Sequence, residues 1–151
     1  MPSSSETASD SMSVISLLGG EAVLHAKPRV PLEWVPLVRK GLPSGSIDAA
    51  IRVTRIPKSD LAHALNISEH TLQRRKREGM LSPEESGKLV RFARIVERTA
   101  LVLEDTDVAL DWIQSPNPSL GGGTPLSLLD TEMGADVVLD TLGRIEHGVF
   151  V

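Results

Sequence analysis

The sequence predicts an all-α fold, and three of its features support this prediction. No stretch of the 151 residues alternates apolar and polar side chains for the length of a strand, so we expect no sheet. Aromatic residues make up only 3% of the chain, and a core of Leu, Val, Ile and Ala suits the seams between helices. Apolar residues recur every three or four positions between Pro and Gly residues, as in short helices. With 40% hydrophobic residues, one sizeable domain or two small domains that share a core are expected.

The first quarter of the chain predicts a tail and a short helical segment. Residues 1–12 are mostly Ser, Thr, Glu, Asp and Ala, and we expect them to form a disordered tail. Residues 14–24 carry enough apolar side chains for a short helix or a helical turn, which Gly19 and Gly20 should break.

Two further helices are expected before residue 58. Apolar side chains recur over residues 31–42, where Pro36 should limit the helix and Gly41 should end it. A second helix should begin at Ser46 and end before Pro57.

Residues 58–78 have the spacing of a helix-turn-helix motif. The small Ala62 lies where two helices must approach closely, and Asn66 tolerates the left-handed turn between them. Ser68 then caps the second helix, whose Leu72 points back into the shared core. This spacing indicates a DNA-binding protein rather than an enzyme.

The outer face of the second helix carries the side chains that would contact DNA. Arg pairs bidentately with guanine and Gln with adenine in the major groove, and further cations suit phosphates. A solvated basic face is the alternative, which the helix-turn-helix spacing disfavours. The candidate DNA-binding residues are Ser68, His70, Thr71, Gln73, Arg74, Arg75, Lys76 and Arg77.

A long helix should follow, beginning at Ser82 with Pro83 at its first position and Glu85 returning the capping bond. Its apolar residues form a narrow seam, typical of a paired helix. A core within the chain and a seam between two copies are equally compatible with this pattern. The seam residues are Leu89, Phe92, Val96, Thr99, Ala100 and Leu103.

The last third predicts more helices. One should cover residues 106–114 and end at the two prolines of residues 115–118. Glycines 121–123 predict a flexible linker, and Thr124 followed by Pro125 indicates another helix start. The last helix should run from a cap at Thr131 to about His147, with Gly148 as its left-handed stop.

Composition and charge exclude several classes. The chain has no Cys, its four His stand apart, and no strand-turn-helix context places a nucleophile, so we expect no metal site, cofactor or catalytic residue. No apolar run could span a membrane and no secretion signal begins the chain, so we expect a cytoplasmic protein. Residues 52–98 hold 11 basic and 6 acidic side chains (+5), whereas residues 99–151 hold 1 and 9 (−8). Such asymmetry indicates two surfaces with different partners.

Several stretches together resemble the Xre/MbcA/ParS-type antitoxins, and in particular the Xre members that pair with RES-domain toxins. The resemblance leaves only the N-terminal tail clearly outside it. It is carried by residues 38–43, 71–75, 81–86, 112–122, 124–134 and 142–148.

This resemblance implies a type II antitoxin with two parts. Residues 13–103 would form a helical DNA-binding region that represses its own operon, as a homodimer on operator DNA. Residues 104–151 would form a helical domain that binds and inhibits an NAD-degrading RES-domain toxin by occluding its active site. The alternative is a stand-alone helix-turn-helix repressor. The toxin-binding residues would be Arg144, His147, Gly148, Val149, Phe150 and Val151, although relatives often carry an aromatic residue in place of His147.

Overall fold

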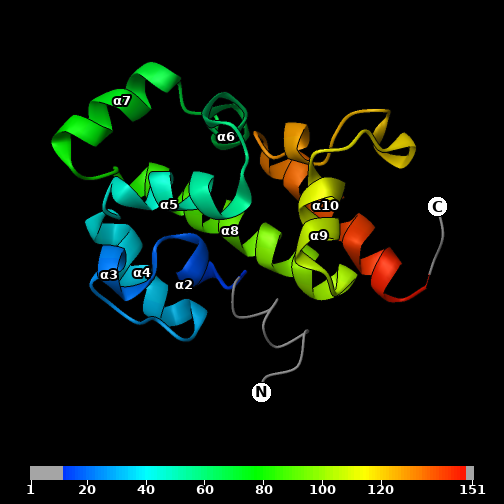
Figure 1. Ribbon diagram of the computed structural model, residues 1–151, viewed down its shortest axis with the longest axis horizontal. Helices are drawn as coiled ribbons and strands as arrows, with labels where there is room; N and C mark the ends of the chain where they lie inside the picture. The colour runs from blue at the N-terminus through cyan, green and yellow to red at the C-terminus, as the bar shows by residue number, and fades with distance from the viewer. Residues whose placement is uncertain (1–11, 149–151) are drawn as a thin grey trace.

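The computed structural model describes residues 12–148, and every regular element within that range is a helix (Figure 1). The expected all-α fold is confirmed, with one isolated backbone bridge between Pro43 and Met80 among the described residues. In chain order the elements are α2 (Val14–Leu17), α3 (Gly20–Leu24), α4 (Pro31–Lys40), α5 (Gly45–Thr54), α6 (Lys58–Leu65), α7 (Glu69–Glu78), α8 (Pro83–Leu103), α9 (Thr106–Ile113), the 3₁₀ turns η1 (Pro118–Leu120) and η2 (Leu126–Leu128), and α10 (Glu132–Glu146).

The N-terminal elements begin in the core. Met12 is only 3% exposed, so its expected place in a disordered tail is wrong; residues 1–11, which hold the rest of that tail, lie outside the described residues. The break between α2 and α3 falls at Gly19 and Gly20 as predicted, because both adopt positive φ angles of 107° and 68°.

Helix α4 corrects one prediction, because it continues through Pro36 instead of being limited by it. Proline cannot donate a backbone hydrogen bond to the carbonyl of the residue four positions earlier, here Leu32. Leu32 is 77% exposed, so solvent can reach this part of the helix. The predicted stop at Gly41 and the helix that precedes Pro57 are both found.

Helix α8 is the central element of the fold. The predicted capping box is present: Ser82 Oγ accepts from Glu85 N at 3.1 Å, and Glu85 Oε1 accepts from Ser82 N at 2.8 Å. Helices α2, α4, α6, α9 and α10 all pack against α8. The predicted seam is therefore buried within the chain except for the half-buried Leu103, and Val90, Ala93 and Ile95 beside it are buried as well. Of the two alternatives for this seam, the structure shows a core within the chain rather than a seam between two copies.

The C-terminal part contains a closed loop where a flexible linker was expected. The backbone N–H of Asn117 donates to the Gly123 carbonyl at 3.0 Å, and Gly122 N–H donates to the Asn117 carbonyl at 3.1 Å. The helix expected after Thr124 is only the 3₁₀ turn η2. One reason is that the chain must turn back toward α10, which begins at the predicted cap Thr131.

Both parts of the chain share a single hydrophobic core. The cluster of buried side chains extends from Met12 to Leu142 without a division at residue 103, because α8 contributes to both parts. Figure 1 shows α7 and the C-terminal end of α10 at opposite ends of the long axis of the molecule. The two candidate sites are therefore well separated.

Candidate nucleic-acid interface and C-terminal segment

Helices α6 and α7 form the predicted helix-turn-helix. The first ends at Asn66, whose φ of 51° lies in the left-handed region. Ser68 begins the second helix, because its hydroxyl oxygen accepts a hydrogen bond from Thr71 N at 3.0 Å. Ala62 and Leu72 are each only 4% exposed, as expected for the small core between the two helices.

Most of the candidate DNA-binding side chains are available to a ligand. The outer face of α7 is exposed along its length, and its basic and amide side chains face away from the core. Lys58, which the sequence analysis did not select, donates from Nζ to Gln73 Oε1 at 3.0 Å and so belongs to the same surface. In the sequence, the position of Lys58 as the first residue of the motif is the feature that could have indicated its place on this surface. The exposed candidates on α7 are His70, Gln73, Arg74, Lys76 and Arg77.

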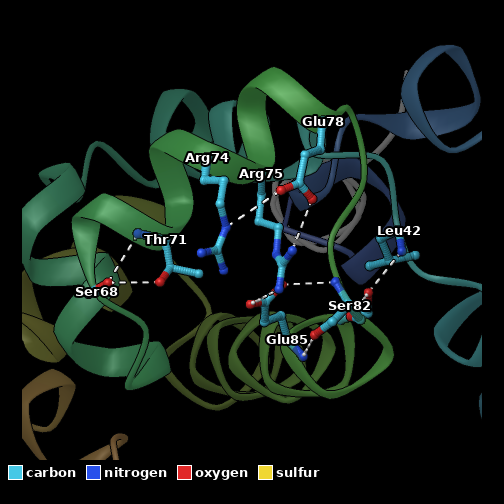
Figure 2. A network of polar contacts seen from close by, with 9 residues as sticks. Leu42, Ser68, Thr71, Arg74, Arg75, Glu78, Ser82 and Glu85 are labelled. Atoms are coloured by element: carbon cyan, nitrogen blue, oxygen red, sulfur yellow. Dashed lines mark hydrogen bonds and ion pairs between the residues drawn. The ribbon is translucent and has the colours of Figure 1, made fainter.

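Arg75 differs from its neighbours, because its guanidinium is hydrogen-bonded to a carboxylate of another helix, whereas Arg74 forms an ion pair only with Glu78 of its own helix, at 3.5 Å (Figure 2). Its Nε and Nη2 donate to Glu85 Oε1 and Oε2 at 2.8 and 3.2 Å, and its Nη1 donates to Glu78 Oε2 at 3.0 Å. The Arg75 side chain is 21% exposed, against 47% for Arg74. Arg75 is therefore already paired within the chain, and its expected contact with DNA stays a prediction.

Two further candidates, Ser68 and Thr71, form the N-terminal cap of α7. The Ser68 hydroxyl donates to Thr71 Oγ1 at 2.9 Å while accepting from the Thr71 backbone. Their hydroxyls thus stabilise the helix end, where backbone N–H groups are well placed for a phosphate.

The pairing of Arg75 changes the acidity of both partners. The hydrogen bond to Glu85 is the main cause that raises the pKa of Arg75. For Glu85, burial alone would raise the pKa, but the hydrogen bonds from Arg75 and Ser82 together hold it below its ordinary value. Both groups therefore remain charged at neutral pH.

The C-terminal candidates lie at the exposed end of α10. Arg144, His147 and Gly148 are exposed, and Gly148 adopts the predicted left-handed conformation with φ of 73°. The remaining candidates Val149, Phe150 and Val151 lie outside the described residues.

An ion pair fastens this end of α10 to the central helix. Arg98 Nη2 of α8 donates to Glu146 Oε1 at 2.6 Å. This hydrogen bond is the main cause that lowers the pKa of Glu146. The last described turn of the chain is therefore joined to α8 at the protein surface.

The outer face of α10 carries apolar residues that the sequence analysis missed. Met133 is 79% exposed and Val137, one turn later, is 41% exposed. Their side of the helix lies opposite the buried Val138 and Leu142. The signal in the sequence was a pair of apolar residues four positions apart, out of phase with the core positions.

The described residues contain neither a cluster of metal ligands nor a membrane-spanning helix. Among residues 12–148, no group of three or more His, Cys, Asp or Glu side chains could hold a metal ion. No helix within the same range is long and apolar enough to cross a membrane.

A basic helix-turn-helix that shares its core with a second helical part is the architecture of a two-part DNA-binding regulator. Comparison with known proteins supports both parts. The antitoxin Xre-like helix-turn-helix domain matches residues 33–94, and the antitoxin Xre/MbcA/ParS C-terminal toxin-binding domain matches residues 99–148.

Individual relatives agree with these matches. An "Antitoxin Xre" of Yersinia enterocolitica is 37% identical over 118 residues, which cover 77% of this chain and 80% of the relative. A second "Antitoxin Xre", of Photorhabdus laumondii, is 34% identical over 75% of this chain and 78% of its own. A "Prs ADP-ribosylating antitoxin" of a Sphingobium species is 25% identical over 80% and 82%. The chain belongs to the Xre antitoxin family, and the predicted resemblance is confirmed.

Proposed function

We propose that this antitoxin binds and inhibits a RES-domain toxin that degrades NAD, and that it binds operator DNA to repress its own operon. The two activities would use opposite ends of the molecule, so that toxin and DNA need not compete for one surface (Figure 1). A single helix-turn-helix contacts few bases, and a homodimer within a larger toxin–antitoxin complex would double the DNA contacts.

The main support for the proposed inhibition of the toxin is the C-terminal end of α10, which an ion pair joins to α8. Arg98 of α8 holds Glu146 shortly before Gly148, and the sequence continues with the apolar residues Val149, Phe150 and Val151. A short apolar segment of this kind can fill an enzyme cleft and exclude its substrate. In the proposed complex these three residues occlude the active site, with Arg144 and His147 beside them.

The proposed substrate of the toxin has separate support. The Sphingobium relative is named as an ADP-ribosylating antitoxin. ADP-ribosyl transfer takes its ADP-ribose from NAD. A toxin that consumes NAD is therefore consistent with this relative.

Deleting Val149 to Val151 tests occlusion. We expect cells that produce a RES-domain toxin to lose protection and their NAD content to fall, whereas the full-length antitoxin preserves both. Replacing the same three residues with Ser keeps the chain length and should also abolish protection, because the apolar side chains are lost. Full protection by both variants would contradict the occlusion.

The double variant Arg74→Ala, Arg77→Ala tests the DNA half. Loss of two groove or phosphate contacts should weaken binding to a duplex from the region upstream of its own gene by at least about tenfold. For each phosphate contact that is lost, the slope of log K against log [salt] should fall by about 1. The matched control Arg29→Ala, Arg39→Ala removes the same charge from exposed sites outside the motif. Equal binding by both double variants would refute the DNA half.

A further inference from the structure

The recognition helix α7 is attached to the core by few apolar contacts. Leu72 is its only buried residue. Its ends are joined to the core by the turn at Asn66 and by a backbone hydrogen bond from Ser44 N to the Gly79 carbonyl at 3.0 Å. These attachments hold the ends of the helix, but a single leucine leaves its rotation about the long axis weakly determined.

Arg75 supplies a second inward contact, three residues after Leu72 and on the same side of the helix. Its two hydrogen bonds to Glu85 are bidentate, which fixes both the distance and the plane of the guanidinium. Glu85 is itself rigidly placed, because its side chain is only 11% exposed and accepts from Ser82 N.

The start of α8, which carries Glu85, is also hydrogen-bonded to Leu42 in the segment between α4 and α5. Ser86, next to Glu85 in α8, accepts a hydrogen bond from Leu42 N through Oγ at 2.8 Å. Leu42 in turn accepts from Leu81 N through its carbonyl at 2.9 Å. Figure 2 shows this continuous network from Leu42 through Ser82 and Glu85 to Arg75.

We propose that the Arg75–Glu85 pair is a clamp that sets the rotation of the recognition helix, and that Arg75 is a positioning residue rather than a DNA contact. The clamp holds Arg74 and Arg77 toward the major groove. This inference rests on the proposed DNA-binding function.

The clamp and simple electrostatics predict opposite effects on DNA binding when Glu85 is neutralised. Glu85 is a negative charge close to the recognition helix, so its neutralisation should strengthen DNA binding if only charge mattered. If Glu85 instead orients the helix, neutralisation should weaken binding. Glu85→Gln separates the two, because Gln at the third helical position still closes the capping box. Its amide NH₂ group would also face Arg75 Nη2, donor against donor.

The experiment compares Glu85→Gln with Glu84→Gln on the upstream duplex. Glu84 is the matched control, since its side chain is 82% exposed and its nearest cation, Lys88, lies 3.6 Å away. We expect Glu85→Gln to bind about tenfold more weakly than the unmodified chain, in line with losing a charge-assisted bidentate pair. Glu84→Gln should bind as tightly or slightly more tightly. Unchanged or tighter binding by Glu85→Gln would overturn the clamp.

Arg75→Lys provides a second variant that keeps the charge. A lysine cannot form the bidentate fork, so we expect weaker binding with an unchanged salt slope. A lost phosphate contact would instead lower the slope, and that result would overturn the positioning role.

A readout without DNA separates failure of the clamp from failure of the proposed function. Hydrogen exchange of the amides of α7 in the free protein should quicken in Glu85→Gln but not in Glu84→Gln. Equal exchange in the two variants would overturn the clamp even if DNA binding were confirmed. If the unmodified chain did not bind the duplex, the proposed DNA function would fail, while the exchange comparison would still decide the clamp.

Discussion

Glu85 combines two local tasks. Its carboxylate closes the capping box of α8 and also receives the guanidinium of Arg75 from the recognition helix. Oε1 accepts both of these bonds and Oε2 accepts from Arg75 Nη2, an arrangement that favours the ionised carboxylate, and these bonds hold the pKa of Glu85 below its ordinary value. A group with a lowered pKa contributes stability at pH values above its ordinary pKa, and this contribution is lost as the pH falls.

The stability of the protein should therefore depend on pH through Glu85. Between about pH 6 and about pH 3, the melting temperature of the unmodified chain should fall more steeply than that of Glu85→Gln, which has no carboxyl group to protonate. The two should converge at the acid end. Circular dichroism melts at several pH values measure this, with Glu84→Gln as control. Parallel curves for the unmodified chain and Glu85→Gln would contradict the assignment.

Helix α10 is the last helix of the region that matches the toxin-binding domain, and it carries the proposed toxin contacts. Its inner face packs in the core through Ala135, Val138 and Leu142, and Gly134 lies so close to the Leu128 carbonyl that a Cβ there would clash. This close approach brings the start of α10 against η2. The outer face leaves Met133 largely in solvent, although burying a methionine side chain is favourable by about 1.5–3 kcal/mol.

We expect the outer face of α10 to contribute to toxin binding alongside the last residues. Met133→Ser should weaken the complex with the toxin by about tenfold, because it removes an apolar side chain from the interface without disturbing the core. Leu32→Ser is a matched control, since Leu32 is 77% exposed and Met133 is 79% exposed. Titration calorimetry measures both. If Met133→Ser and Leu32→Ser bound the toxin with equal affinity, the toxin would bind another surface of the protein.

At the scale of the whole molecule, α8 joins the two parts. The two matched family regions meet inside this helix, one ending at residue 94 and the other beginning at residue 99. Leu89 and Thr99 lie on either side of that junction and are both fully buried. A helix with buried residues on both sides of a boundary cannot unfold in one part alone without exposing the other.

The two parts should therefore unfold together. The chain has two tryptophans, Trp34 in α4 and Trp112 in α9, and each reports on one part. In the variants Trp34→Phe and Trp112→Phe, fluorescence should give the same urea midpoint as circular dichroism measured on the same variant. Within either variant, a fluorescence midpoint clearly different from the circular dichroism midpoint would show two independent units.

The sequence by itself determined most of the helices and the residues that cap them. Asn66, Ser68, Ser82 and Thr131 act on backbone groups within four residues of themselves, so their roles could be read from spacing alone. The family was also predictable, because its motifs lie in continuous stretches. These features need no knowledge of how the helices are arranged.

Only the tertiary structure decided which surfaces are free. Arg75 looked like its neighbour Arg74 until α8 brought Glu85 beside it. Likewise, the seam of α8 became core and Met133 remained exposed because of where α9 and α10 pack. The availability of a side chain depends on partners from other elements, and the relative placement of helices follows from the sum of many weak packing contacts rather than from any local pattern.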